Sequence, residues 1–100
     1  MEKGDKVILQ MQKSVAENGQ IDDRKHSCSI LRYDPAKECI YLLLEDTVLT
    51  EISLDGIYTC RIRSKEKEYR LNGRIRERYL SEAGKVLEFQ VEDGSYVVCE

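Results

Sequence analysis

The sequence predicts an all-β fold, a small antiparallel barrel or sandwich of six or seven short strands. Residues 57–63 and 69–79 alternate apolar and polar side chains with a period of two, which places the two kinds on opposite faces of a strand. Turn-forming residues recur about every 8–12 residues, a spacing typical of such folds. No segment has a convincing helical period, so we expect little helix.

The first half of the chain contains three predicted strands, at residues 6–12, 27–33 and 39–45. Residues 14–23 are polar and contain an Asn-Gly dipeptide, typical of a hairpin loop or a short mobile segment. The Asp-Pro pair that begins residues 34–38 predicts a tight turn, because proline fixes φ at the second turn position. The third strand is apolar on both faces, so we expect it to be central or buried on both sides.

The second half contains four further predicted strands, at residues 57–63, 69–79, 85–91 and 96–99. A charged hairpin tip at residues 64–68 joins the first two, and an Asp-Gly turn at residues 93–94 joins the last two. The connection between the predicted strands at residues 39–45 and 57–63 has two interpretations. Residues 50–54 alternate like a short edge strand, whereas residues 48–54 also fit one helical turn.

The strand at residues 69–79 separates its side chains by parity. One parity is mainly apolar and contains Tyr69, Leu71, Gly73, Ile75 and Tyr79. The other parity is rich in arginine and contains Arg70, Asn72, Arg74, Arg76 and Arg78. A hairpin centred near Glu66 would bring two arginines of the preceding strand onto the same face. The candidate anion face therefore consists of Arg61, Arg63, Arg70, Arg74 and Arg76.

This arginine-rich face has two interpretations. It suits RNA or another phosphate-rich ligand, because arginine binds phosphate through paired hydrogen bonds. It also suits the solvated outer face of an antiparallel sheet, with nearby glutamates neutralising the charge. Binding of single-stranded RNA favours aromatic rings interleaved with the cations, and Tyr69 and Tyr79 have the opposite parity. The pattern therefore favours the solvated face over RNA binding.

Composition limits the class of protein. The 100 residues are expected to form one domain, residues 1–100, with ordinary globular composition. A net charge of −3 and a pI of about 5.3 exclude long-range attraction of the whole molecule to nucleic acid or anionic membranes. The N-terminus does not resemble a signal peptide, and no apolar run approaches transmembrane length. We expect a cytoplasmic protein without membrane insertion.

The cysteines and the histidine form no familiar metal or catalytic motif. The four cysteines, Cys28, Cys39, Cys60 and Cys99, are scattered and form no CxxC pair, whereas zinc sites use closely spaced ligand pairs. In a reducing compartment we expect them to be small buried hydrophobes. The single histidine, His26, is beside no recognisable nucleophile motif. We therefore expect no metal, no cofactor and no enzymatic activity.

The stretch Glu51-Ile52-Ser53-Leu54-Asp55-Gly56 resembles the second motif of PilZ domains, the receptor domains for cyclic di-GMP. That motif has Asp or Asn, any residue, Ser, two further residues and Gly. Ser53 and Gly56 match it, and Glu51 replaces the usual Asp or Asn. Residues 71–76 and 86–89 also resemble the closing strands of the family.

The first PilZ motif, two arginines four residues apart, is matched only in part. Arg24 and Lys25 lie at a suitable distance before the second motif, but Ser29 follows Lys25 where the second arginine is expected. Two arginines four residues apart occur only within residues 70–78, and these residues follow the second motif instead of preceding it.

The chain also resembles the N-terminal domain of YcgR-type flagellar brake proteins, which usually precedes a PilZ domain. That domain begins with a short Gly-x-x-Val-x-Leu segment, matched by Gly4-Asp5-Lys6-Val7-Ile8-Leu9. A later strand followed by a charged hairpin resembles Tyr58-Thr59-Cys60-Arg61-Ile62.

Both resemblances imply a split β-barrel and a non-enzymatic regulatory or protein-interaction module in bacterial cyclic di-GMP signalling. The ligand-site residues they imply are Arg24, Lys25, Glu51, Ser53 and Gly56. In such a site arginine binds phosphate and stacks on guanine, and a carboxylate accepts hydrogen bonds from the guanine edge. Because the second arginine is missing and glutamate reaches farther than aspartate, we expect weak or absent nucleotide binding. A protein partner or a second copy of the chain would then remain as the ligand.

Overall fold

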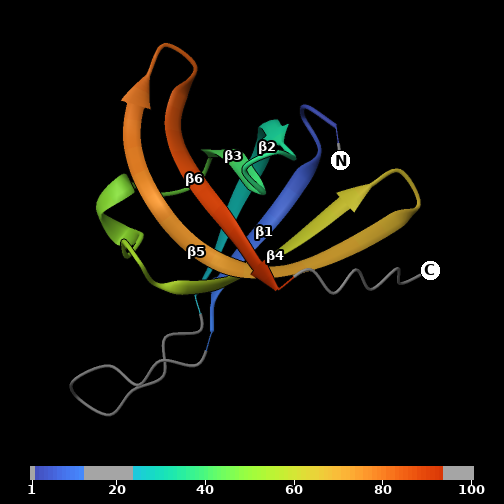
Figure 1. Ribbon diagram of the computed structural model, residues 1–100. Helices are drawn as coiled ribbons and strands as arrows, with labels where there is room; N and C mark the ends of the chain where they lie inside the picture. The colour runs from blue at the N-terminus through green and yellow to red at the C-terminus, as the bar shows by residue number, and fades with distance from the viewer. Residues whose placement is uncertain (1, 13–23, 94–100) are drawn as a thin grey trace.

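The computed structural model describes residues 2–12 and 24–93 and shows an all-β chain (Figure 1). Its strands are β1 (Lys6–Met11), β2 (Lys25–Asp34), β3 (Cys39–Leu44), β4 (Ile57–Ser64), β5 (Lys67–Ser81) and β6 (Gly84–Asp93). The one helical element in these residues is a short 3-10 helix, η1 (Leu49–Glu51). The predicted loop at residues 14–23 and strand at residues 96–99 lie outside the described residues.

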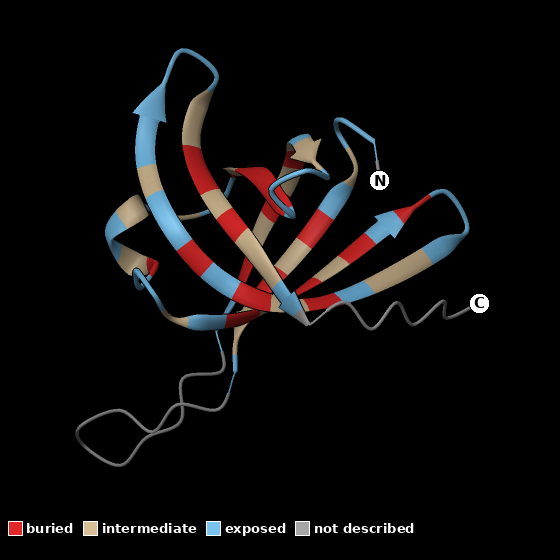
Figure 2. Ribbon diagram, in the orientation of Figure 1, coloured by how far each residue is buried: buried red, intermediate tan, exposed pale blue. Residues whose placement is uncertain are grey.

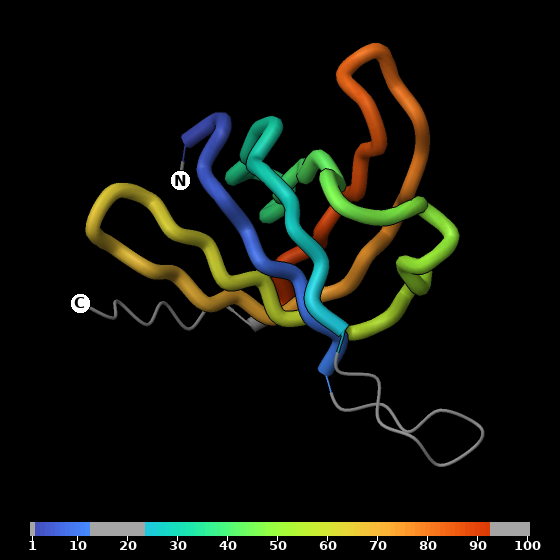
Figure 3. The backbone as a smooth tube through the Cα atoms, turned by 180° about the vertical axis from the view of Figure 1, so that it is seen from behind, coloured from blue at the N-terminus to red at the C-terminus, as the bar shows by residue number. Residues whose placement is uncertain are grey.

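The strands close into an antiparallel barrel in the order β1-β2-β3-β6-β5-β4, with β4 pairing back to β1. The chain runs through two meanders, β1 to β3 and β4 to β6, which join along β3–β6 and β1–β4. Figure 3 shows the second join, where β1 lies between β2 and β4. This six-stranded closed barrel confirms the predicted fold class.

The barrel interior is filled by inward-facing apolar side chains from every strand, visible as the alternating buried residues in Figure 2. Tyr58, Phe89 and Leu9 are among the largest of them, and each is at most 1% exposed. Burial of a side chain of this size contributes about 1.5–3 kcal/mol to folding. The period-two alternation in the sequence is therefore the main determinant of the barrel.

Strand β3 is buried on both faces, as its apolar sequence predicted. Leu42 lies in the barrel interior, whereas Cys39 and Tyr41 pack with Val86 of β6 in a second apolar cluster. The guanidinium of Arg32 lies 3.9 Å from the centroid of the Tyr41 ring, a cation–π contact. Neighbouring strands thus cover the outward side of β3 as well as its inward side.

The predicted parity of β5 is wrong in its last third, because Arg76 is the extra residue of a β-bulge opposite β6. Beyond a bulge of one residue, every side chain changes face. Arg78 pairs with Leu87, a core residue, and therefore points inward. Tyr79 was expected to face the core, but it pairs with Val86 on the outer side and is 39% exposed.

The connection between β3 and β4 forms helix η1, so the helical turn is correct and the alternative edge strand is wrong. The N–H of Glu51 donates to the carbonyl of Val48, and the N–H of Ile52 donates to the carbonyl of Leu49, each at 3.1 Å. The turn places Ile52 in the core with 0% exposure, whereas Leu54 remains 48% exposed.

Three of the cysteines are buried free thiols, as expected: Cys28, Cys39 and Cys60. Cys99 lies outside the described residues. Desolvation raises the pKa of Cys28 to about 12 and the pKa of Cys60 well above its usual value. Both thiols therefore stay protonated at neutral pH and pack as apolar groups.

Candidate functional site

The site residues implied by the PilZ resemblance come from three segments of the barrel. Arg24 and Lys25 lie at the start of β2, Glu51 ends helix η1, and Ser53 and Gly56 lie in the turn before β4. The closure of the barrel brings the start of β2 next to the end of η1. Only Arg24 and Glu51 among the five are joined by a side-chain interaction.

Arg24 and Glu51 form an ion pair in which Nη1 of the arginine donates to Oε2 of the glutamate. The two side chains are 56% and 40% exposed, so the pair contributes less than about 1 kcal/mol to stability. The guanidinium expected to bind phosphate and the carboxylate expected to accept from guanine are thus already joined by one hydrogen bond, which leaves the other donors of Arg24 and the second oxygen of Glu51 outside this bond.

The second half of the first motif offers a weaker set of contacts. Lys25 is exposed and lies opposite Gln10 of β1. Ser29, at the place of the second arginine, lies opposite Lys6 of β1. A serine hydroxyl has neither the charge nor the paired donors of a guanidinium. The phosphate contacts available here are therefore reduced to one paired arginine and one lysine.

Ser53 contributes to the turn through its backbone. Its N–H donates to the hydroxyl oxygen of Tyr58 at 3.0 Å, while the residue itself is exposed. The Tyr58 side chain is buried, with 1% exposure, so the bond satisfies a hydroxyl at the edge of the core. This role needs no particular side chain at position 53.

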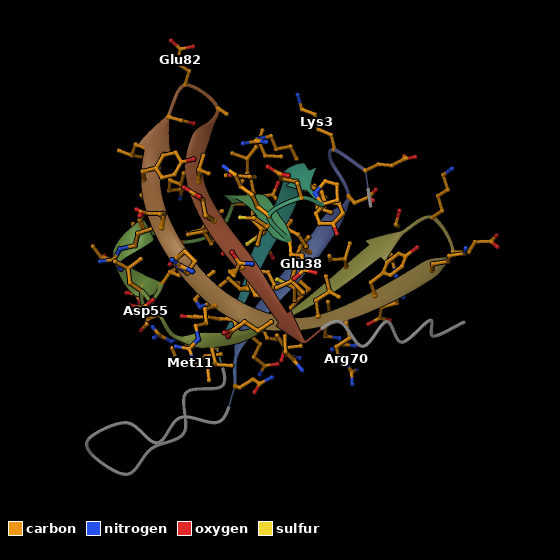
Figure 4. All side chains as sticks on the ribbon, in the orientation of Figure 1. Lys3, Met11, Glu38, Asp55, Arg70 and Glu82 are labelled. Carbon is orange, nitrogen blue, oxygen red and sulfur yellow. The ribbon has the colours of Figure 1, made fainter. Side chains whose placement is uncertain are left out.

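Gly56 is favoured by close packing, not by a left-handed conformation. The positive φ of this turn, 60°, belongs to Asp55, which Figure 4 labels. A Cβ on Gly56 would lie 3.0 Å from Cε2 of Tyr58 and 3.2 Å from the side chains of both Met11 and Ser53. The turn is tied to β5 by hydrogen bonds to the backbone of Ile75, so the glycine has limited room to move away. The turn that starts β4 therefore accounts for Ser53 and Gly56 without a ligand.

Sequence reasoning missed Arg78, which binds the connection between β3 and β4. Its Nη1 donates to the carbonyl of Leu49 at 3.1 Å and to the carbonyl of Ile52. The carbonyl of Leu49 thus accepts a second bond besides that from the Ile52 N–H, and the carbonyl of Ile52, at the end of helix η1, gains a side-chain donor. No sequence signal marks the bulge that turns Arg78 inward, so alternation alone assigned it to the opposite face.

Three large apolar side chains are exposed in and around this connection. Val48 precedes helix η1, Leu54 lies in the turn and Ile57 begins β4, with exposures of 56%, 48% and 44%. Contiguous exposed apolar patches mark surfaces that contact other proteins, whereas single exposed apolar side chains are common on any protein.

The outer face of β1, β4 and β5 carries part of the predicted anion face. Directly opposed residues form three rows, Lys6–Arg63–Glu68, Ile8–Arg61–Arg70 and Gln10–Thr59–Asn72. We call Lys6, Arg61, Arg63 and Arg70 the basic face; Figure 4 labels Arg70, far from the turn at Asp55. In this face Nε of Arg61 donates to Glu68 at 3.1 Å.

The other two predicted arginines are placed differently. Nε of Arg74 donates to Oε1 of Glu92 at 2.8 Å, and Arg76 is the extra residue of the bulge. Three of the five predicted arginines therefore share the rows with β1.

Within residues 2–12 and 24–93, no group of three or more His, Cys, Asp and Glu side chains is arranged to hold a metal ion. In the same part of the chain no helix is long and apolar enough to cross a membrane. Comparisons with protein-family models, curated proteins and solved structures find no match.

Proposed function

We propose that this chain is a non-enzymatic regulatory or protein-interaction module of the PilZ/YcgR type, acting in the cytoplasm in bacterial cyclic di-GMP signalling. Its own nucleotide site is degenerate, and its ligand is another protein. The observation that carries the proposal is the ion pair between Arg24 and Glu51.

The ion pair opposes nucleotide binding at both ends of the ligand. A phosphate that takes Nη1 of Arg24, or a guanine that takes Oε2 of Glu51, must break this bond, which costs less than about 1 kcal/mol for an exposed pair. Ser29 supplies no second guanidinium to offset this cost. The expected outcome is loss of the nucleotide site with retention of the barrel.

A role in protein contact is supported by the exposed apolar residues of the same connection, Val48, Leu54 and Ile57. A nucleotide-binding role for the basic face is less well supported. In the described part of the chain its rows contain no aromatic ring on which a base could stack. We therefore propose a protein ligand in preference to RNA.

Calorimetric titration of cyclic di-GMP into the purified chain tests the degenerate site. We expect no saturable heat from the wild-type protein and none from Arg24→Ala. Tight binding that is lost in a folded Arg24→Ala protein would overturn the proposal. Far-ultraviolet circular dichroism of both proteins provides the control for folding.

Sedimentation velocity tests whether the protein ligand is a second copy. Self-association through the exposed connection predicts a dimer that forms with rising concentration and is lost in Leu54→Asp. If the wild-type protein stays monomeric at all concentrations, a second copy is excluded and the protein ligand is a different protein.

A further inference from the structure

We propose that the basic face, Lys6, Arg61, Arg63 and Arg70, is the docking site for an extended acidic segment of the partner protein. The inference rests on the proposed function, because it names the chemistry of the protein ligand. It concerns the outer face of β1, β4 and β5, which is separate from the residues implied by the PilZ resemblance.

The register of the barrel concentrates like charges on this face. Lys6 lies directly opposite Arg63, and Arg61 lies directly opposite Arg70. Like charges in directly opposed positions destabilise a sheet, so their presence on two adjacent rows is not explained by folding. Glu68 is the one acidic residue in the three rows.

The acidic neighbours leave part of this charge unpaired. Arg61 pairs with Glu68, and Nζ of the 73% exposed Lys6 lies 3.3 Å from Glu45. Within the described residues, the side chains of Arg63 and Arg70 take part in no hydrogen bond or ion pair. By contrast, the third row is internally satisfied, because Oγ1 of Thr59 donates to Asn72 at 2.9 Å.

The spacing of the face matches that of an extended polypeptide. Lys6, Ile8, Arg61, Arg63 and Glu68 line a surface depression of about 270 Å³. Alternate residues of a strand lie roughly 6.6–6.8 Å apart. Acidic side chains at alternate positions of an extended segment have the same repeat. Successive carboxylates can therefore meet Arg63 and the N–H donors of Arg61 that its bond to Glu68 does not use. Arginine binds carboxylate through two parallel hydrogen bonds, which favours this pairing.

Fluorescence anisotropy of a labelled peptide that alternates glutamate with serine tests the proposal. We expect saturable binding to the wild-type chain that weakens with rising salt. The double variant Arg63→Gln/Arg70→Gln should bind about tenfold more weakly, because two exposed charge contacts are lost. A charge-matched control, Lys37→Gln/Arg76→Gln, changes exposed cations outside the basic face and should bind like wild type. Melting curves of all proteins verify folding.

A second peptide tests the spacing. It carries the same number of glutamates in one contiguous block and should bind more weakly than the alternating peptide. Equal affinity for the two peptides would contradict the match to the strand repeat.

Three results would overturn the proposal: no binding of the alternating peptide by wild type, an equal loss in the control variant, or tighter binding of labelled oligothymidylate through Arg63 and Arg70. The last result would identify nucleic acid as the ligand class. Failure here is distinguishable from failure of the proposed function, because cyclic di-GMP is titrated separately and its candidate site lies outside the basic face.

Discussion

Gly73 lies where β5 changes partners, and replacing it with alanine should be among the most damaging small changes in the barrel. It pairs with Tyr58 of β4 and with Val91 of β6. Figure 1 shows β5 curving continuously between its two hairpins. A Cβ on Gly73 would lie 2.0 Å from the carbonyl oxygen of Gln90 and 2.9 Å from the Phe89 ring. The obstruction is backbone, so rotation of a side chain does not relieve it.

The size of the loss follows from this clash. The Cβ and the Gln90 oxygen must separate by about 1 Å before they reach 3.0 Å, which disturbs the β5–β6 ladder. Overpacking of a core typically lowers the free energy of unfolding by about 1–3 kcal/mol. Because the obstructing Gln90 carbonyl belongs to the backbone, we expect Gly73→Ala to cost about 3 kcal/mol or more. For a domain of this size that corresponds to a fall in Tm of roughly 12–24 °C.

Urea unfolding followed by far-ultraviolet circular dichroism measures the loss. Gly56→Ala is the matched control, because its nearest contacts, at 3.0–3.2 Å, are side-chain atoms that can give way. We expect about 1 kcal/mol for the control. A Gly73→Ala protein within about 1 kcal/mol of wild type, or no less stable than Gly56→Ala, would refute the reasoning.

Three further predictions concern individual side chains elsewhere in the barrel. Arg78→Met should lower the free energy of unfolding in urea by about 1–3 kcal/mol, because the carbonyl groups of Leu49 and Ile52 lose their hydrogen bonds from the guanidinium; a loss below about 0.5 kcal/mol would contradict this role. Cys28 and Cys60 should resist iodoacetamide in the native protein at neutral pH and react after unfolding, as mapped by mass spectrometry, since burial raises the pKa of both thiols; rapid native labelling would contradict their burial. The hydrogen bond from the backbone N–H of Glu2, and then a bond to the Ser64 side chain, lower the pKa of Asp5 below 3.8. The ionised Asp5 carboxylate therefore stabilises the folded state above pH 3.8, and this stabilisation is lost as the pH falls through the lowered pKa. Asp5→Asn should accordingly weaken the fall of the free energy of unfolding on the acid side of its pH dependence. An unchanged pH dependence would contradict this role.

The fold was predictable from the sequence because its determinants are local. The alternation in β4 and in the first part of β5 reflects which side chains face the core, and the apolar run of β3 reflects burial on both faces. The bulge at Arg76 was not predictable, because no glycine or proline marks it and its effect depends on the pairing with β6. It reversed the assigned faces of Arg78 and Tyr79.

The candidate site was predictable only as a set of residues. A motif can align Arg24 and Glu51 with a ligand, but their mutual ion pair joins positions 27 residues apart and depends on how the barrel closes. The same limit applies to the basic face. The hairpin between β4 and β5 was foreseen, whereas the pairing of β1 with β4, which adds Lys6 beside Arg63, required the closed sheet.

The central claim is that the nucleotide site is degenerate, because Arg24 is bonded to Glu51 and Ser29 stands where the second arginine is expected. A nitrogen-15 heteronuclear correlation spectrum recorded during titration with cyclic di-GMP tests it residue by residue. We predict no saturable shift at Arg24, Lys25, Glu51, Ser53 or Gly56. Saturable shifts confined to these residues would show an active site and contradict the claim.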